Sequence, residues 1–164
     1  MINRNSLIAN EFMGKGYSDI CPVLDMHAHM FSYYGAYMSA DTPEKMLKYM
    51  DRSGVKTAVF ASHSALNEGR DFISQDLDIA RRYHERFLCY YPVLSRITDP
   101  NYDLKMIESN NEYIGMKFLC DYYQVPLSDE KHTPYWEYAD DHKMAVLCHT
   151  WGSSKFNGAE EIEK

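Results

Sequence analysis

The sequence has no long hydrophobic run. No stretch approaches the roughly 20 consecutive apolar residues that a membrane-spanning helix needs. The first 20 residues, MINRNSLIANEFMGKGYSDI, also lack the continuous apolar core of a secretion signal. We therefore expect a cytoplasmic protein that has no membrane partner.

A basic stripe is missing as well. The 164 residues carry a formal net charge of -7, and the acidic residues are spread along the chain. A protein that binds a phosphate backbone needs many clustered lysine and arginine side chains. Nucleic acid is therefore not an expected partner.

Paired cysteines are absent, because none of the four cysteines forms a C-x-x-C pair. We predict small buried thiols in a reducing compartment, rather than a redox or metal site, for Cys21, Cys89, Cys120 and Cys148. A chain of this length can bury roughly 70% of its unfolded surface and needs no disulfide or metal to build a core. We predict one domain over residues 1–164, with residues 1–20 as an N-terminal extension.

Short apolar runs alternate with segments of helical periodicity. The apolar runs predict strands over residues 21–30, 55–62, 86–94, 113–119 and 144–150. The segments between them predict helices over residues 41–54, 71–84, 100–109 and 133–143. Thr42 and Thr133 are expected as N-caps because a proline follows each of them, and Gly54 is expected just past a helix end. Residues 151–164 predict a polar loop and the start of a further helix.

Strands that alternate with helices predict a parallel sheet, because each parallel connection needs a crossover that lies on the sheet face. Two architectures fit this pattern. A flavodoxin-like doubly wound sheet would be complete with five strands, whereas an eight-stranded barrel of ~250 residues would be only partly present. The strand count alone favours the smaller fold.

Two histidines stand at the end of the first predicted strand, in CPVLDMHAHM. Side chains two residues apart in a strand point to the same face roughly 6 to 7 Å from each other, so His27 and His29 could bind one ion. His149 ends the fifth predicted strand, and the carboxyl ends of parallel strands meet at one edge. Three imidazoles are the minimum for an open catalytic zinc. The alternative is a set of hydrogen-bonded histidines at strand ends.

Two further side chains are candidates at the same edge. Asp25 faces the same side as His27 and could move a proton of a metal-bound water, or it could be a structural carboxylate that orients a histidine. His63 follows the second predicted strand and is a candidate for substrate contact. A solvated loop histidine is the alternative for His63.

The segment VLDMHAHM resembles the D-x-H-x-H signature that opens the amidohydrolase superfamily. Residues 114–150 are similar to the middle of the amidohydrolase-related metal-dependent hydrolases, in which a Gly-x-Lys segment and a Pro-Leu-Tyr-Glu-x-Ala helix precede a strand that ends in His-Thr. The similarity runs in order and spacing over residues 21–152. It reverses the fold choice, because it implies an α/β fold of the (β/α)8 TIM-barrel type, of which only about the first five strand-helix units are present.

The resemblance also implies roles for the histidines. His27 and His29 would be first-strand metal ligands, and His149 the fifth-strand histidine, either as a direct ligand or as the partner of a bound water. Zinc is the default ion for such a site, although manganese or iron would accept the same ligands.

Lys117 stands on the fourth strand, where some superfamily members carry a carboxylated lysine that bridges two metals; a substrate-facing ammonium is the other reading. The histidine that commonly follows that lysine by two residues is Leu119 in this sequence. Tyr122 is a candidate replacement for its substrate contact.

The resemblance implies a metal-dependent hydrolase, in which a metal-activated water attacks a C–N or C–O bond of a small molecule. A decarboxylase of the same family is the nearest alternative reaction. A non-catalytic α/β binding module is the alternative from another class.

Family members continue through three more strands that add another histidine and an aspartate. We therefore expect this sequence to be the N-terminal part of a longer enzyme. The alternatives are a second chain or copy that closes the barrel, as in a homo-oligomer, and a rearranged open sheet.

Overall fold

The computed structural model describes residues 5–33, 35, 37–67, 69–151 and 156. One parallel sheet contains the strands β1 (Val23–Ala28), β2 (Val55–Phe60), β3 (Phe87–Val93), β4 (Tyr113–Phe118) and β5 (Ala145–Cys148). Each predicted strand is present, with ends that differ by a few residues. The prediction for residues 151–164 lies almost entirely outside the described residues.

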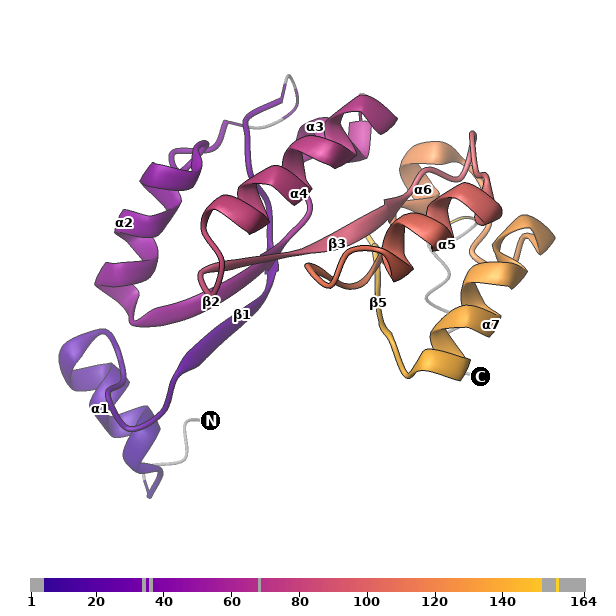
Figure 1. Ribbon diagram of the computed structural model, residues 1–164. Coiled ribbons are helices and arrows are strands. Elements are labelled where there is room, and N and C mark those ends of the chain that lie inside the picture. Colours follow the sequence, from indigo (N-terminus) through magenta and orange to yellow (C-terminus); the bar gives the residue numbers. More distant parts are fainter. Residues whose placement is uncertain (1–4, 34, 36, 68, 152–155, 157–164) are drawn as a thin grey trace.

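The spatial order of the strands is β1-β2-β3-β4-β5, the order of the sequence, and the sheet curls into a half-barrel (Figure 1). A flavodoxin-like sheet has the order 2-1-3-4-5, in which the chain reverses its winding direction. The structure therefore confirms the partial barrel and excludes the doubly wound alternative.

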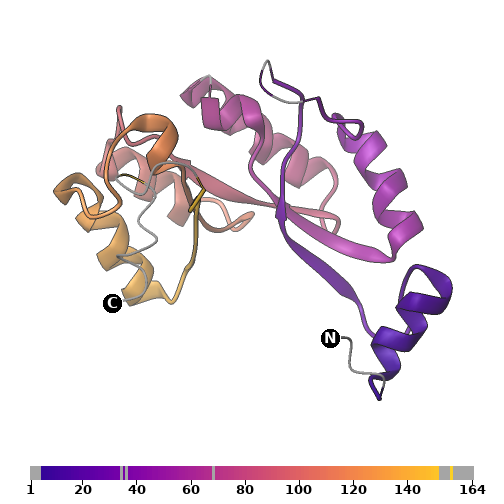
Figure 2. The same cartoon turned by 180° about the vertical axis from the view of Figure 1, so that it is seen from behind.

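The helices are α1 (Leu7–Lys15), α2 (Pro43–Ser53), α3 (His63–Asn67), α4 (Ile73–Arg82), α5 (Pro100–Glu108), α6 (Cys120–Tyr123) and α7 (Thr133–His142). Single 3-10 turns precede two of them, at Arg70–Phe72 and Glu130–His132. The view from behind shows α1 beside the start of β1 and apart from the other helices (Figure 2). Within the described residues, no helix combines the length and the apolar character needed to cross a membrane.

The helix ends test three predictions. The Thr42 hydroxyl accepts a hydrogen bond from the Lys45 amide at 3.3 Å, and Gly54 takes a left-handed φ of 71°, so both ends of α2 are confirmed. The Thr133 prediction is wrong, because Thr133 is the first residue of α7 and no side chain caps that helix. The turn Glu130–His132 runs directly into α7 and takes the place of a side-chain cap.

Residues 63–67, for which the sequence predicts neither a strand nor a helix, form α3. The reason is local, because the buried Ser62 hydroxyl accepts a hydrogen bond from the Ala65 amide at 3.0 Å. Ser62 thus acts as the N-cap of a short helix directly after β2.

The sheet is covered on one face by helices and lined by a smaller apolar cluster on the other. Phe60 and Phe118 belong to the main core, which includes side chains of α2, α4, α5 and α7. Val59, Tyr90 and Leu119 belong to the second cluster. Because side chains alternate between the faces of a strand, this second cluster marks the concave face of the half-barrel.

All four cysteines are free thiols. Cys89 and Cys120 are buried as predicted, whereas Cys21 and Cys148 are only half-buried. The half-burial of Cys148 follows from its place on β5, which within the described residues pairs only with β4.

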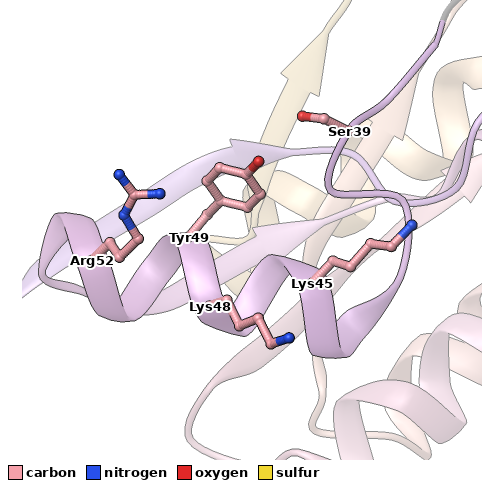
Figure 3. Close-up of a pocket in the computed structure, with 5 residues that line it drawn as sticks. All are labelled: Ser39, Lys45, Lys48, Tyr49 and Arg52. Carbon is pink, nitrogen blue, oxygen red and sulfur yellow. The ribbon is translucent and has the colours of Figure 1, made fainter.

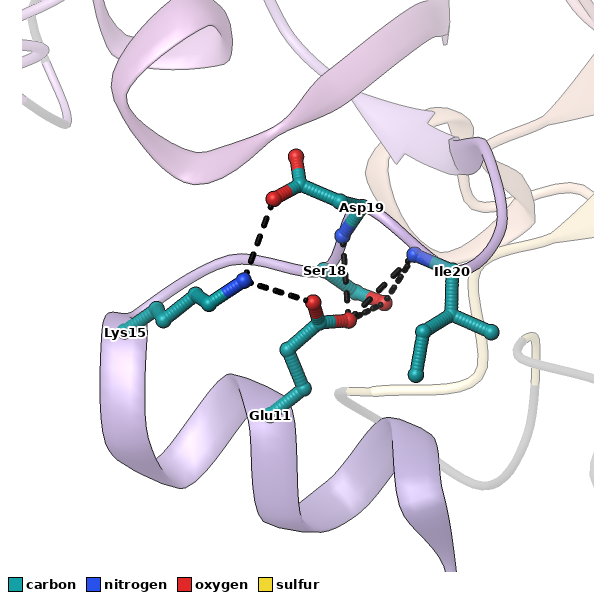
Figure 4. A network of polar contacts seen from close by, with 5 residues as sticks. All are labelled: Glu11, Lys15, Ser18, Asp19 and Ile20. Atoms are coloured by element: carbon teal, nitrogen blue, oxygen red, sulfur yellow. Dashed lines mark hydrogen bonds and ion pairs between the residues drawn. The ribbon is translucent and has the colours of Figure 1, made fainter.

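The helix α1 is held to the segment that leads into β1 (Figure 4). The Glu11 carboxylate accepts hydrogen bonds from the Ser18 hydroxyl at 2.7 Å and from the Asp19 amide at 3.0 Å. The hydrogen bond from Lys15 is the largest of the contacts that lower the pKa of Glu11 to about 2. The predicted N-terminal extension therefore contains a helix that is hydrogen-bonded to the segment preceding β1.

Candidate functional site

The histidine pair lies at the carboxyl end of β1. The ring centroids of His27 and His29 are 5.0 Å apart, and the rings meet edge to face. The Asp25 Oδ1 accepts a hydrogen bond from the His27 backbone amide at 3.0 Å. The two imidazoles therefore share one face of the strand end, as the spacing predicts.

The hydrogen bond of His29 leaves one of its ring nitrogens able to bind a metal ion. Its Nδ1 lies 2.9 Å from the Ala61 carbonyl oxygen. A carbonyl only accepts hydrogen bonds, so Nδ1 carries the proton and Nε2 keeps its lone pair. Burial lowers the pKa of His29 to about 4, which makes the ring neutral at pH 7. Burial, together with the charge of Lys117, also lowers the pKa of His27.

Lys117 reaches this region from β4. Its side chain is only 1% exposed, and within the described part of the chain its Nζ has no hydrogen-bond partner. Burial lowers the pKa of Lys117 to about 8, so most molecules still carry an ammonium at pH 7. A buried cation without a counter-charge is costly, so an anion placed beside Lys117 would stabilise its charged form.

His149 follows β5 and lies on the same face. Its backbone amide donates a hydrogen bond to the Phe118 carbonyl at 3.0 Å, so pairing with β4 continues for one residue past the strand. Its ring meets Tyr122 edge to face, with centroids 5.2 Å apart. Burial lowers the pKa of His149, and the nearby charges of Lys117 and His27 lower it further.

A glycine on β4 permits this close approach. A Cβ at Gly115 would lie 2.5 Å from the Ala145 carbonyl oxygen and 2.8 Å from the Tyr90 ring. Any other residue would push β5 or Tyr90 away. Gly115 therefore helps to bring Lys117 and His149 together.

A cavity of about 50 Å³ joins these elements. It is lined by His29, Tyr33, His63, Leu66, Asn67, Lys117, Leu119, Tyr122 and His149. Five residues predicted from the sequence thus meet around one space. Asp25 and His27, the other two, do not line it.

His63 is the first residue of α3 and is not a solvated loop histidine. Its Nδ1 lies 2.7 Å from the Phe31 carbonyl oxygen, and its ring stacks on His29 with centroids 4.8 Å apart. Tyr33 also packs against His63, with ring centroids 4.5 Å apart. Sequence reasoning missed Tyr33, although its place in the loop directly after the histidine pair was a usable signal.

The residues present fit a divalent metal ion in their donor chemistry. The neutral rings of His27 and His29 suit zinc or manganese. Among the described residues, however, no three His, Cys, Asp or Glu side chains come together closely enough to hold an ion. The ligand set of His27, His29 and His149 therefore stays a prediction, and a complete site requires movement of His149 or donors from another segment.

A buried carboxyl group is hydrogen-bonded to Ser62, the residue before His63. Asp76 of α4 is fully buried, and its Oδ2 accepts a hydrogen bond from the Ser62 amide at 2.8 Å. Within the described residues its Oδ1 has no partner. Burial raises the pKa of Asp76 to about 7.

We expect Asp76→Asn to change the pH dependence of stability. The folded pKa of about 7 lies above the ordinary value of 3.8 for an aspartate, so the native state binds more protons than the unfolded state between these values. The contribution of Asp76 to the free energy of unfolding is therefore present at pH 4 and lost as the pH rises to 7. The variant does not titrate, so it should be more stable than the native chain at pH 8 by on the order of 1–4 kcal/mol.

Urea unfolding at pH 4, 5.5 and 8 measures this difference. Asp78→Asn, at an exposed position of the same helix, is the matched control and should follow the native profile. Parallel profiles of Asp76→Asn and the native chain would contradict the prediction.

No family model matches the sequence, and no curated protein matches it. Solved structures do match. A 2,6-dihydroxybenzoate decarboxylase complexed with 2,6-dihydroxybenzoate has a TM-score of 0.62 at 12% identity, over 82% of this chain and 52% of that protein. The 2,6-dihydroxybenzoate decarboxylase from Rhizobium has a TM-score of 0.60 at 14% identity, over 82% of this chain and 51% of that protein.

A 5-carboxyvanillate decarboxylase from Novosphingobium aromaticivorans, with bound manganese, has a TM-score of 0.60 at 14% identity, over 91% of this chain and 55% of that protein. All of these structural neighbours are decarboxylases. The chain spans about half the length of each. At this level of identity the likeness establishes the fold: this chain has the fold of the first half of such a barrel.

Proposed function

We propose that this chain forms the first half of the active site of a metal-dependent decarboxylase that acts on a small aromatic carboxylic acid. The observation that carries the proposal is the buried ammonium of Lys117, which has no hydrogen-bond partner among the described residues and lies in a cavity that His29 and His149 also line. A carboxylate is the natural partner of such a cation. The names of the structural neighbours support the same reaction class.

In the proposed reaction, different residues of this chain would bind the metal ion and the substrate. His27 and His29 would hold the divalent ion, with His149 as a third ligand or as a proton carrier. Zinc stays the prediction from the sequence, although one neighbour binds manganese. The bound ion would supply a positive charge that polarises the substrate or a water. Lys117 would bind the carboxylate, and His63 and Tyr122 would contact the rest of the substrate.

Decarboxylation breaks the bond between the carboxylate carbon and the ring. The electron pair stays on the ring carbon, which then takes up a proton, so the site needs a proton carrier. His149 lines the cavity, which makes it the better placed candidate. Because burial lowers its pKa, His149 would first take up a proton from water and then deliver that proton to the ring carbon. Asp25 already accepts a backbone hydrogen bond, and its catalytic role stays a prediction.

A hydrolase is the second candidate function, because the motif resemblance in the sequence favours it. Hydrolysis would use the same ion to activate a water for attack on a C–N or C–O bond. A small-molecule substrate is part of both proposals. The cytoplasmic location, the absence of a nucleic-acid partner and the homo-oligomer stay predictions.

Turnover tests the two reactions against each other. This chain, together with the segment or second copy that completes the barrel and supplied with manganese or zinc, is incubated with 2,6-dihydroxybenzoate or 5-carboxyvanillate, and CO₂ release is measured beside a panel of esters and amides. We expect CO₂ release that falls by about 100-fold in Lys117→Met, because the substrate carboxylate loses its counter-charge. Ester or amide cleavage without CO₂ release would favour the hydrolase.

The same variant has a built-in control for folding. Replacing a buried, unpaired amine by an apolar chain of similar length should leave the free energy of unfolding unchanged or raise it. Equal CO₂ release by Lys117→Met and the native chain would contradict the role of Lys117. Metal binding with no turnover on any substrate would favour the binding module.

A further inference from the structure

The outer face of α2 carries a basic cluster that the candidate active site does not use. Lys45, Tyr49 and Arg52 are spaced by four and three residues, so they lie along one side of the helix, and Lys48 directly precedes Tyr49. Together with Ser39 from the preceding loop they line a cavity of about 380 Å³ (Figure 3). All five residues are exposed.

The acidic residues of α2 do not neutralise this cluster. Glu44 accepts a hydrogen bond from the Tyr83 hydroxyl, and Asp51 forms an ion pair with Arg86 at 2.7 Å. The Glu44 carboxylate is therefore occupied and does not form the pair with Lys48 that helical spacing allows. In the part of the chain that the structure describes, neither Lys48 nor Arg52 has an ion-pair partner.

The third cation of the cluster, Lys45, is paired with an acidic residue. The Lys45 ammonium forms an ion pair with Asp41 at 2.7 Å, so its charge is largely balanced. Figure 3 shows the Arg52 guanidinium and the Tyr49 hydroxyl on the same side of the helix as Ser39, with Lys48 on the other side. The cavity thus has two unbalanced cations and two hydroxyl groups, in a chain whose net charge is -7.

This combination fits one kind of ligand. Guanidinium and ammonium groups bind phosphoryl oxygens, and neighbouring hydroxyls donate to the remaining oxygens. The cavity is at the small end of the roughly 300–1,000 Å³ range of ligand pockets, which suits a phosphoryl group with a short organic portion. The cluster is too short for the extended backbone of a nucleic acid, which needs many successive phosphate contacts.

We propose that this face of α2 binds a small phosphate monoester. Arg52 contacts the phosphoryl group, Lys48 adds positive potential, and the Ser39 and Tyr49 hydroxyls donate hydrogen bonds. The site is separate from the proposed active site, because none of its residues lines the cavity that contains His29 and Lys117.

Isothermal titration of the 164-residue chain with glycerol 3-phosphate, and separately with inorganic phosphate, tests the proposal at low salt. We expect glycerol 3-phosphate to bind with a Kd of about 1 mM or lower. The double variant Lys48→Ala, Arg52→Ala should bind at least about tenfold more weakly, and Tyr49→Phe severalfold more weakly.

Lys105→Ala, Lys131→Ala is the matched control, because it removes the same charge from exposed positions outside the cavity. This control should bind like the native chain. Far-UV circular dichroism verifies that each variant is folded.

Three results would overturn the proposal. One is the absence of binding by the native chain, and another is equal weakening in both double variants, which would mean general charge attraction. The third is binding to vesicles that contain phosphatidate without binding to the free phosphates, which would mean a membrane headgroup as the ligand.

Discussion

The double variant His27→Ala, His29→Ala is expected to lose its metal. Protein purified without added metal or chelator should contain about one divalent ion per chain, and the double variant less than about 0.1. The reason is the geometry of the strand end, where the two rings lie 5.0 Å apart and the Nε2 of His29 keeps its lone pair. Plasma mass spectrometry measures the content and also identifies the ion as zinc, manganese or iron.

His84→Ala, His142→Ala is the matched control, since both histidines are exposed and belong to helix or loop surfaces. It removes the same two imidazoles per chain and should keep the metal content of the native protein. Equal loss in both double variants would mean adventitious surface binding. A folded native chain without metal would mean that this half of a barrel cannot hold the ion alone.

Asp103→Ala is expected to destabilise the protein by about 3–5 kcal/mol. The Asp103 carboxylate is 2% exposed and accepts hydrogen bonds from the Tyr91 hydroxyl at 2.6 Å and the Tyr135 hydroxyl at 2.5 Å. Arg70 approaches the same carboxylate at 3.2 Å. The alanine variant would leave two buried hydroxyls and a cation without their acceptor, and each unmade bond costs free energy.

This cluster joins four elements, because Arg70 precedes α4, Tyr91 lies on β3, Asp103 on α5 and Tyr135 on α7. Urea unfolding gives the free energy, and Asp78→Ala on the exposed side of α4 is the control, with a change within about 0.5 kcal/mol. Asp103→Asn keeps one acceptor and should fall between the two. A loss in Asp103→Ala no larger than in Asp78→Ala would contradict the argument.

The strand-helix order and the histidine pair could be predicted from the sequence because both depend on local periodicity. An alternation of apolar runs and helical segments specifies the elements, and a spacing of two residues places His27 and His29 on one face. The Thr42 cap of α2 is equally local. The helix α3 was not predicted and the Thr133 position was mispredicted, because Ser62 supplies one cap and a 3-10 turn replaces the other.

The strand order is not a local property. Five strand-helix units are compatible with a doubly wound sheet and with part of a barrel, and the strand count alone favoured the former. Only the observed pairing of each strand with its neighbour in sequence decides for the half-barrel. The motif resemblance pointed to the same fold, but it did so through the family and not through the physics of the strands.

In the candidate site, too, some features could be predicted from the sequence and others depend on the tertiary structure. The sequence predicts four of the residues that line the cavity, from their types and their positions at strand ends. These residues are His29, His63, Lys117 and His149. Other features depend on segments far apart in the chain. Lys117 is buried without a hydrogen-bond partner among the described residues, His63 stacks on His29 and packs against Tyr33, and Asp103 accepts hydrogen bonds from two tyrosine hydroxyls. Local periodicity determines the face of each strand, whereas the register and curl of the sheet determine which side chains meet across it.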